Sequence, residues 1–122
     1  PALRWRATGS MLADTGSTVD PLMSRCYDTL LGNPDHIAGT LRMMAGWDLP
    51  PLIRGLPALK MPVWLAAAEG DRTIPPERST SVAQDLPHAR TMRIPKLGHL
   101  AHEEDPEVFD ALFEEMVTET AA

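Results

Sequence analysis

The 122-residue chain has little cysteine and no long apolar run, and each scarcity excludes a class of protein. The single cysteine, Cys26, permits no internal disulfide, and no cysteine–histidine spacing typical of zinc sites is present. No apolar run approaches the roughly 18 residues of a membrane span, and residues 1–10 lack the apolar stretch of a secretory signal. We therefore expect a cytoplasmic protein with no membrane span, no metal site and no cofactor.

The chain also lacks an excess of positive charge. Its net charge is −6, and the imbalance lies in the second half: residues 1–61 hold 6 basic and 5 acidic side chains, whereas residues 62–122 hold 5 and 12. Nucleic-acid binding requires a basic surface, so no nucleic-acid partner is expected. The acidic side chains from Glu103 to Glu119 are typical of a solvated helix face, with an interaction surface as the alternative.

Residues 20–57 carry the signals of helices. Asp20 and Asn33 each precede a proline, which joins a capping side chain to a residue suited to the first helical position. Apolar residues then recur at helical spacing as far as Gly32 and Gly46, where each helix is expected to end. Two helices with apolar faces of this kind need a sheet or a ligand to cover them.

The segments around these two helices are less regular. Cys26 falls on the apolar stripe of the first helix and is expected to be a small core residue. Asp48 is expected to cap a third helix, which the two prolines that follow confine to a turn or two. Residues 1–19 contain two glycine–serine pairs and are expected to form a loop.

The second half of the chain alternates strand and helix. The apolar run at 63–68 predicts a strand buried on both faces, and residues 90–94 predict a more polar edge strand. A helix is expected between them, from about Pro75 to Leu86, and another is expected to begin at Pro106. This alternation implies a right-handed crossover and parallel strands, so the predicted fold class is α/β.

An ionisable side chain follows each predicted strand. Asp71 lies in a Glu-Gly-Asp turn after the first strand, and His99 lies in a Gly-His turn after the second. Because the carboxyl ends of parallel strands meet at one edge of a sheet, we expect the two side chains to converge there. A carboxylate that orients a histidine, which in turn activates a nucleophile, is the arrangement of a hydrolytic triad. Taken alone, Asp71 is more typical of an ordinary turn.

The neighbours of these two residues are expected to have structural roles. Gly98 allows the loop to approach closely or to adopt a positive φ. His102 is expected to be a structural histidine near the start of the last helix, with substrate contact as the alternative. Glu103 and Glu104 are expected to stabilise the N-terminus of that helix, where the helix dipole favours anions.

Three segments carry a family resemblance. The stretches EGDRTIPP at 69–76 and GHLAHEEDP at 98–106 resemble turns of α/β-hydrolases, in which the triad acid and histidine follow the seventh and eighth strands. With MMAGWDLPPL at 43–52 added, the chain is similar to the magnesium-chelatase accessory proteins of bacteriochlorophyll synthesis. The resemblance is good over residues 60–117, and residues 20–57 resemble the helical cap that such enzymes insert before the seventh strand.

The resemblance implies the C-terminal part of an α/β-hydrolase fold, with two parallel strands and flanking helices preceded by a helical cap. It divides the chain into a cap with an N-terminal linker, residues 1–57, and a strand-helix-strand-helix core, residues 58–122. Asp71 and His99 would be the catalytic acid and base. No serine lies in a Gly-x-Ser-x-Gly elbow, so we expect a missing N-terminal half of the domain to be the partner that supplies the nucleophile. On this interpretation the chain alone is inactive.

The cap carries the predicted substrate contacts. Met43, Met44 and Trp47 are expected to line a pocket for a small hydrophobic substrate, because methionine adapts to irregular apolar space. Packing of the cap on the core is a second reading of the same residues and is compatible with the first. Two other functions remain open: a non-catalytic module that binds a hydrophobic or tetrapyrrole-like ligand, and a self-sufficient domain of unrelated function, which would leave a strand edge unpaired.

Overall fold

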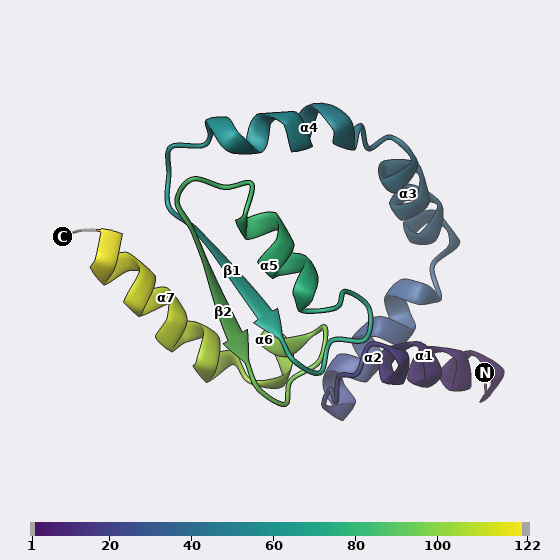
Figure 1. Cartoon of the computed structure of the whole chain (residues 1–122). Helices are drawn as coiled ribbons and strands as arrows, with labels where there is room; N and C mark the ends of the chain where they lie inside the picture. Colours follow the sequence, from purple (N-terminus) through teal and green to yellow (C-terminus); the bar gives the residue numbers. More distant parts are fainter. Residues whose placement is uncertain (1, 121–122) are drawn as a thin grey trace.

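The structure is a computed structural model that describes the backbone of residues 2–120 and the side chains of residues 8–120. Helices come first in the chain: α1 (Ala2–Asp14), α2 (Pro21–Leu31), α3 (Pro34–Ala45), α4 (Leu49–Gly55) and the 3₁₀ turn η1 (Leu56–Ala58). The order then becomes β1 (Val63–Ala68), α5 (Glu77–Ala83), β2 (Ala89–Ile94), α6 (Ala101–Glu104) and α7 (Pro106–Thr120) (Figure 1).

The two strands form a parallel sheet in which Val63 lies opposite Ala89 and Ala68 lies opposite Ile94. The predicted α/β class and the parallel pairing are therefore confirmed for the described residues. Helices α5 and α7 lie on opposite sides of this sheet (Figure 1). Since both strands run in the same direction, the turns that follow them meet at one edge of the sheet.

Local capping explains where α2 and α3 begin. The Asp20 carboxylate accepts the N–H groups of Leu22 and Met23 at 2.6 and 3.0 Å, and the Asn33 side chain accepts those of Asp35 and His36 in the same way. Both helices end at the predicted glycines. The prediction for Asp48 is half right, because α4 begins directly after it but its side chain makes no capping hydrogen bond to the described residues.

The prediction of a loop over residues 1–19 is wrong for most of that segment, since α1 occupies Ala2–Asp14. Helix-favouring alanine, leucine, methionine and arginine outnumber Gly9 and Ser10, and a mid-helix glycine costs only about 1 kcal/mol. Helix α1 packs against α2, and Thr8 and Leu12, four residues apart on one face, are buried. Tertiary packing therefore stabilises a helix that Gly9 and Ser10 make irregular in the sequence.

Burial is lower than the sequence predicts. Cys26 is exposed, so its assignment to a core is wrong, and the described side chains of α2 include none that is buried. Only Ala67 of β1 is buried among the described residues, although both faces of this strand were expected to be covered. The physical reason is that the sheet has two described strands, and α7 stands off from it over an open apolar hollow. That hollow is lined by Trp64, Ala66, Met92, Phe109, Leu112, Phe113 and Met116.

Helix α5 ends at Ala83 rather than near Leu86. The residues after it form tight turns, in which the N–H groups of Asp85 and Leu86 donate to the carbonyls three residues before them. Pro87 disfavours a helical conformation at the preceding residue. Leu86 is nevertheless buried as predicted, with 7% of its surface exposed.

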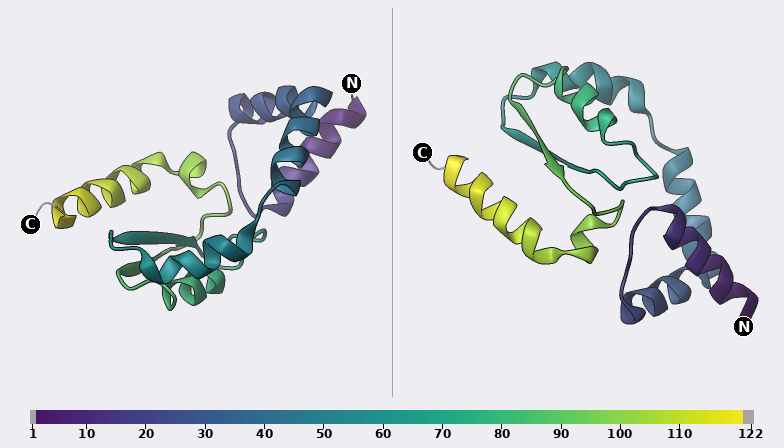
Figure 2. Two further views of the ribbon diagram at one scale, coloured as in Figure 1. Left: turned by 90° about the horizontal axis from the view of Figure 1, so that it is seen from above. Right: turned by 60° about the horizontal axis from the view of Figure 1, so that its bottom comes forward.

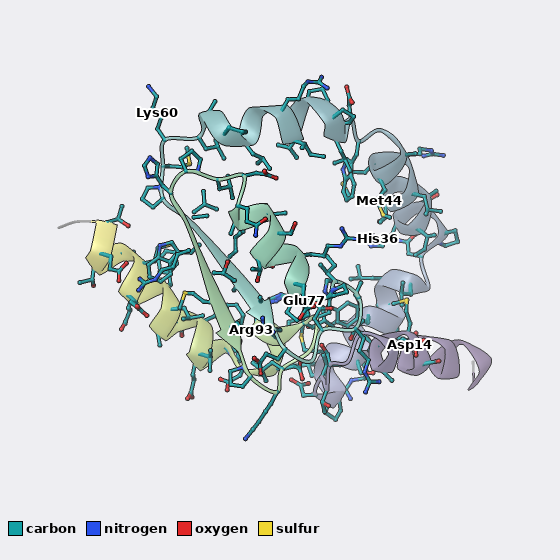
Figure 3. The ribbon with its side chains drawn as sticks, viewed as in Figure 1. Asp14, His36, Met44, Lys60, Glu77 and Arg93 are labelled. Carbon is teal, nitrogen blue, oxygen red and sulfur yellow. The ribbon has the colours of Figure 1, made fainter. Side chains whose placement is uncertain are left out.

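Helices α3 and α4 form an arc that joins α2 to the start of β1, near Lys60 (Figures 1 and 3). Figure 2 shows the same separation of α7, the sheet and the first helices from two further directions. The arc is largely uncovered by the described residues, because its apolar side chains are exposed: Leu41, Met43, Met44, Trp47, Leu49, Leu52 and Ile53.

Candidate acid–histidine site

Asp71 and His99 meet at the carboxyl ends of the two strands. The Oδ2 atom of Asp71 lies 2.9 Å from Nδ1 of His99, as expected for residues that follow neighbouring parallel strands. The Asp71 side chain is 13% exposed and the His99 side chain 32% exposed. The pair is therefore shielded on the acid side and open on the imidazole side.

The acid is held in its ionised form. Burial works against ionisation, but hydrogen bonds from the Ile74 N–H, the His99 ring and the Thr73 N–H outweigh it and lower the pKa of Asp71 below its ordinary value of 3.8. Oδ1 accepts the two backbone N–H groups at 2.8 Å each, which leaves Oδ2 for the imidazole. An ionised acceptor at this position favours the tautomer with the proton on Nδ1, so Nε2 presents a lone pair.

The chain between α1 and α2 braces both turns. The carbonyl oxygen of Thr15 accepts the N–H of Arg72, next to the acid, and the N–H of His99, both at 3.2 Å. The N–H of Gly70 donates to the carbonyl of Leu97 at 2.8 Å, which ties the two turns directly to each other. A segment that was predicted to be a loop and linker thus contributes the contacts that set the spacing of acid and base.

Two glycines make this close approach possible. Gly16 has a φ of +81°, and a Cβ built there would overlap the carbonyl oxygen of Gly70. A Cβ at Gly98 would overlap the carbonyl carbon of Gly16 and lie 2.5 Å from the backbone nitrogen of Ser17. The expected close approach at Gly98 is confirmed, whereas positive φ angles occur at Gly16 and at Lys96, two residues before Gly98. Any larger side chain at either position would push the brace away from the turns.

Glu103 and Glu104 do not act as predicted. The Glu104 carboxylate accepts the N–H groups of Gly98 and Thr18 at 2.7 and 2.9 Å, and Glu103 accepts the Tyr27 hydroxyl at 2.7 Å. Both side chains therefore bond to segments before the last helix instead of lying at its N-terminus. The reason is the short extra helix α6, which was not predicted from the sequence and which directs these side chains away from α7.

Other predicted residues lie outside the acid–histidine contact. Glu69, the second acid of its turn, pairs with Arg93 at 3.1 Å and not with the histidine; Arg93 also approaches Glu77 of α5 (Figure 3). His102 is 61% exposed and its ring packs edge-on against Phe109, at 6.1 Å between ring centres. This contact agrees with a structural role for His102.

Met43, Met44 and Trp47 lie on α3 and the turn after it, and all three are exposed. Helix α3 lies apart from the carboxyl ends of the strands in Figure 1. The structure therefore brings these three residues close to one another. That they line a substrate pocket at the site of Asp71 and His99 stays a prediction.

The sequence of the chain resembles that of one known protein. The chain is similar to a magnesium-chelatase subunit. Over 95 residues, 78% of the chain, it is 45% identical to the "Magnesium-chelatase 30 kDa subunit" of Rhodobacter capsulatus. The chain spans about a third of the length of that relative, 33%. No protein-family profile matches the chain.

No group of three or more histidine, cysteine, aspartate or glutamate side chains within the described part of the chain is arranged to hold a metal ion. Among the helices of residues 2–120, none is both long and apolar enough to cross a membrane.

Proposed function

We propose that this chain supplies the acid and the base of a serine-type hydrolase site, in a protein of the α/β-hydrolase fold that acts with magnesium chelatase in bacteriochlorophyll synthesis. The observation that carries the proposal is the 2.9 Å contact between Asp71 and His99 at the carboxyl ends of two parallel strands. The similarity to the magnesium-chelatase 30 kDa subunit supports the biosynthetic setting. The division of the chain into a cap with its linker, residues 1–57, and a core, residues 58–122, is part of the same proposal.

The two residues would act as follows. Nε2 of His99 takes the proton of a serine hydroxyl as its oxygen attacks an acyl carbon, and Asp71 stabilises the imidazolium that forms. The imidazolium then gives this proton to the departing alcohol, which leaves an acyl-enzyme. In the second half of the reaction, His99 takes a proton from water as the water oxygen attacks the acyl carbon, and it returns this proton to the serine oxygen as the acid is released. The serine would come from a part of the protein before this chain, since no serine of the chain lies in a nucleophile elbow.

The test uses the intact gene product and a fluorophosphonate probe, which labels an activated serine. The wild-type protein is expected to be labelled and to hydrolyse p-nitrophenyl esters. His99→Gln and Asp71→Asn are each expected to lower kcat/KM on the order of 10³-fold. His88→Gln, at an exposed histidine before β2, is the matched control and should keep wild-type activity. Absence of labelling in the wild type would overturn the hydrolase proposal.

A second candidate function is non-catalytic binding of a planar tetrapyrrole. It is favoured by one observation, the exposure of Met43, Met44 and Trp47 on adjacent turns, with 57%, 43% and 59% of their surfaces accessible. Large apolar side chains grouped on a surface often mark binding sites. Titration with protoporphyrin IX should then quench tryptophan fluorescence, and Trp47→Ala should weaken binding at least tenfold. Leu22→Ala, an equally exposed apolar residue on α2, is the control.

A further inference from the structure

Glu104 is the last residue of α6, yet its side chain reaches back to the turn that carries His99. Oε1 accepts the N–H of Gly98 at 2.7 Å, directly before the histidine. Oε2 accepts the N–H of Thr18 at 2.9 Å, 86 residues away in the chain. One carboxylate therefore joins the histidine turn to the segment between α1 and α2.

Three consecutive N–H groups of the histidine turn are satisfied by this junction. That of Gly98 donates to Glu104, that of His99 to the Thr15 carbonyl, and that of Leu100 to the Ser17 hydroxyl oxygen at 2.8 Å. Ser17 directly precedes Thr18, whose N–H donates to the Glu104 carboxylate. The N–H before His99 is thus bonded to Glu104 itself, and the N–H after it is bonded to the residue next to the second partner of Glu104.

The charge of Glu104 matters to this arrangement. Burial opposes its ionisation, but the hydrogen bonds from the Thr18 and Gly98 N–H groups and from Ser17 lower its pKa below the ordinary value of 4.5. A carboxylate is an acceptor at both oxygens, whereas an amide has one acceptor and one donor group. A glutamine in its place would direct an NH₂ group at a backbone N–H and break one side of the junction.

We propose that Glu104 is a positioning residue for His99: by joining the Gly98 N–H to the segment at 17–18, it keeps Nδ1 of the imidazole on Asp71. This role rests on the hydrolase site proposed above, in which the Nδ1–H tautomer is the productive one. Glu104 does not touch the reacting groups, and the Ser17 hydroxyl accepts the Leu100 N–H.

The primary test is the ring ¹⁵N spectrum of His99 in the intact gene product, read alongside the rate of fluorophosphonate labelling. His99→Gln identifies the signals, since the chain has four histidines. The wild type is expected to show a single tautomer with the proton on Nδ1. Glu104→Gln is expected to give a mixture of tautomers and to slow labelling at least tenfold in protein that is still folded by circular dichroism. Glu104→Asp, which keeps the charge, is expected to recover part of both.

Glu107→Gln is the matched control, because Glu107 is an exposed glutamate on the first turn of α7. It should leave tautomer and labelling rate unchanged. If Glu104→Gln does not fold, Ser17→Ala replaces it, since this change removes the acceptor of the Leu100 N–H at the same junction.

The outcomes separate this proposal from the hydrolase proposal. A folded Glu104→Gln or Ser17→Ala protein with the wild-type tautomer would overturn the positioning role, whatever its activity. A wild type that is never labelled, but whose tautomer shifts on Glu104→Gln, would keep the positioning role and remove the hydrolase. A loss of stability alone, with unchanged tautomer and labelling per folded molecule, would make Glu104 purely structural.

Discussion

The junction around Asp71 and His99 and the arc of α3 and α4 are held in opposite ways. At the junction, backbone N–H groups, carbonyls and carboxylates from three distant segments satisfy one another, and glycines allow the chains to touch. Along the arc, α3 has a side-chain cap at Asn33, but apolar side chains such as Leu52 and Ile53 are more than half exposed. The hydrogen bonds of the junction hold its turns in place. The arc instead exposes apolar surface to which a ligand or another part of the protein could bind.

The largest effect is expected where the junction is tightest. Gly98→Ala would place a Cβ against the Gly16–Ser17 backbone, 2.5 Å from the nitrogen of Ser17, and we expect it to lower the free energy of unfolding by about 3 kcal/mol. Gly39→Ala, in α3, is the matched control, since a Cβ there meets no described atom within 4 Å. That change should instead stabilise the protein by about 0.5–1 kcal/mol. Urea unfolding measures both, and equal midpoints would contradict the comparison.

Acid should weaken the junction before it affects the arc. Asp71 and Glu104 have lowered pKa values in the folded protein, so their stabilisation is fully present above the ordinary values of 3.8 and 4.5 and is lost as pH falls through the folded values. Hydrogen bonds to charged groups contribute about 1.5–3 kcal/mol each. The urea midpoint should fall steeply below about pH 4.5 in the wild type. The Asp71→Asn, Glu104→Gln double variant should show a flatter profile, and parallel profiles would refute the assignment.

Tyr27 tests the contact between α2 and the site region. Burial, the hydrogen bond to Glu103 and the charge of Glu103 raise the pKa of this phenol to about 12. Because the folded pKa is raised, its stabilisation is complete below pH 10 and is lost as pH rises through about 12. Tyr27 is the single tyrosine of this chain, so the difference in phenolate absorbance between the wild type and Tyr27→Phe reports its titration.

Tyr27→Phe should lower the free energy of unfolding by about 1 kcal/mol, the value of an ordinary hydrogen bond. Thr29→Val serves as a control on the same helix, because the Thr29 hydroxyl donates to the Arg25 carbonyl within α2 and does not reach the site region. A phenol that titrates at its ordinary value of 10 in the folded protein would show that α2 is not docked on Glu103.

The smallest effect is expected on the arc. Leu52→Ala, at a side chain 60% exposed, should change the free energy of unfolding by less than about 0.5 kcal/mol. The same substitution at Leu86, 7% exposed, should cost about 2 kcal/mol or more because it removes buried surface. A large loss of unfolding free energy at Leu52 would mean that the arc is covered in the intact protein. The contrast between the junction and the arc would then be smaller.

Sequence patterns predicted the parts of the fold that depend on local chemistry. The caps at Asp20 and Asn33, the strand at 63–68 and the parallel pairing are confirmed. The meeting of Asp71 and His99 followed from topology, because neighbouring parallel strands end at one edge. Their catalytic roles and the pocket around Met43, Met44 and Trp47 stay predictions.

Tertiary context accounts for what was missed. Helix α1 is stabilised by packing on α2, and this packing could not be predicted from a segment that contains Gly9 and Ser10. The brace at Thr15 uses backbone atoms, which leave no trace in residue identity. Glu104 was visible as an acid, but its direction depends on α6, a four-residue helix too short to produce a periodic pattern. Burial was overestimated because an apolar run indicates a face to be covered without indicating what covers it.

The Thr15 carbonyl has one more consequence. Because a single oxygen serves the amides of both Arg72 and His99, the two turns cannot relax independently: a movement that lengthens one bond alters the other. Acid and base are therefore coupled through the main chain as well as through the 2.9 Å contact of their side chains. Changes in the two turns should be non-additive, and a ligand that displaces residue 15 would disable both members of the pair in one step.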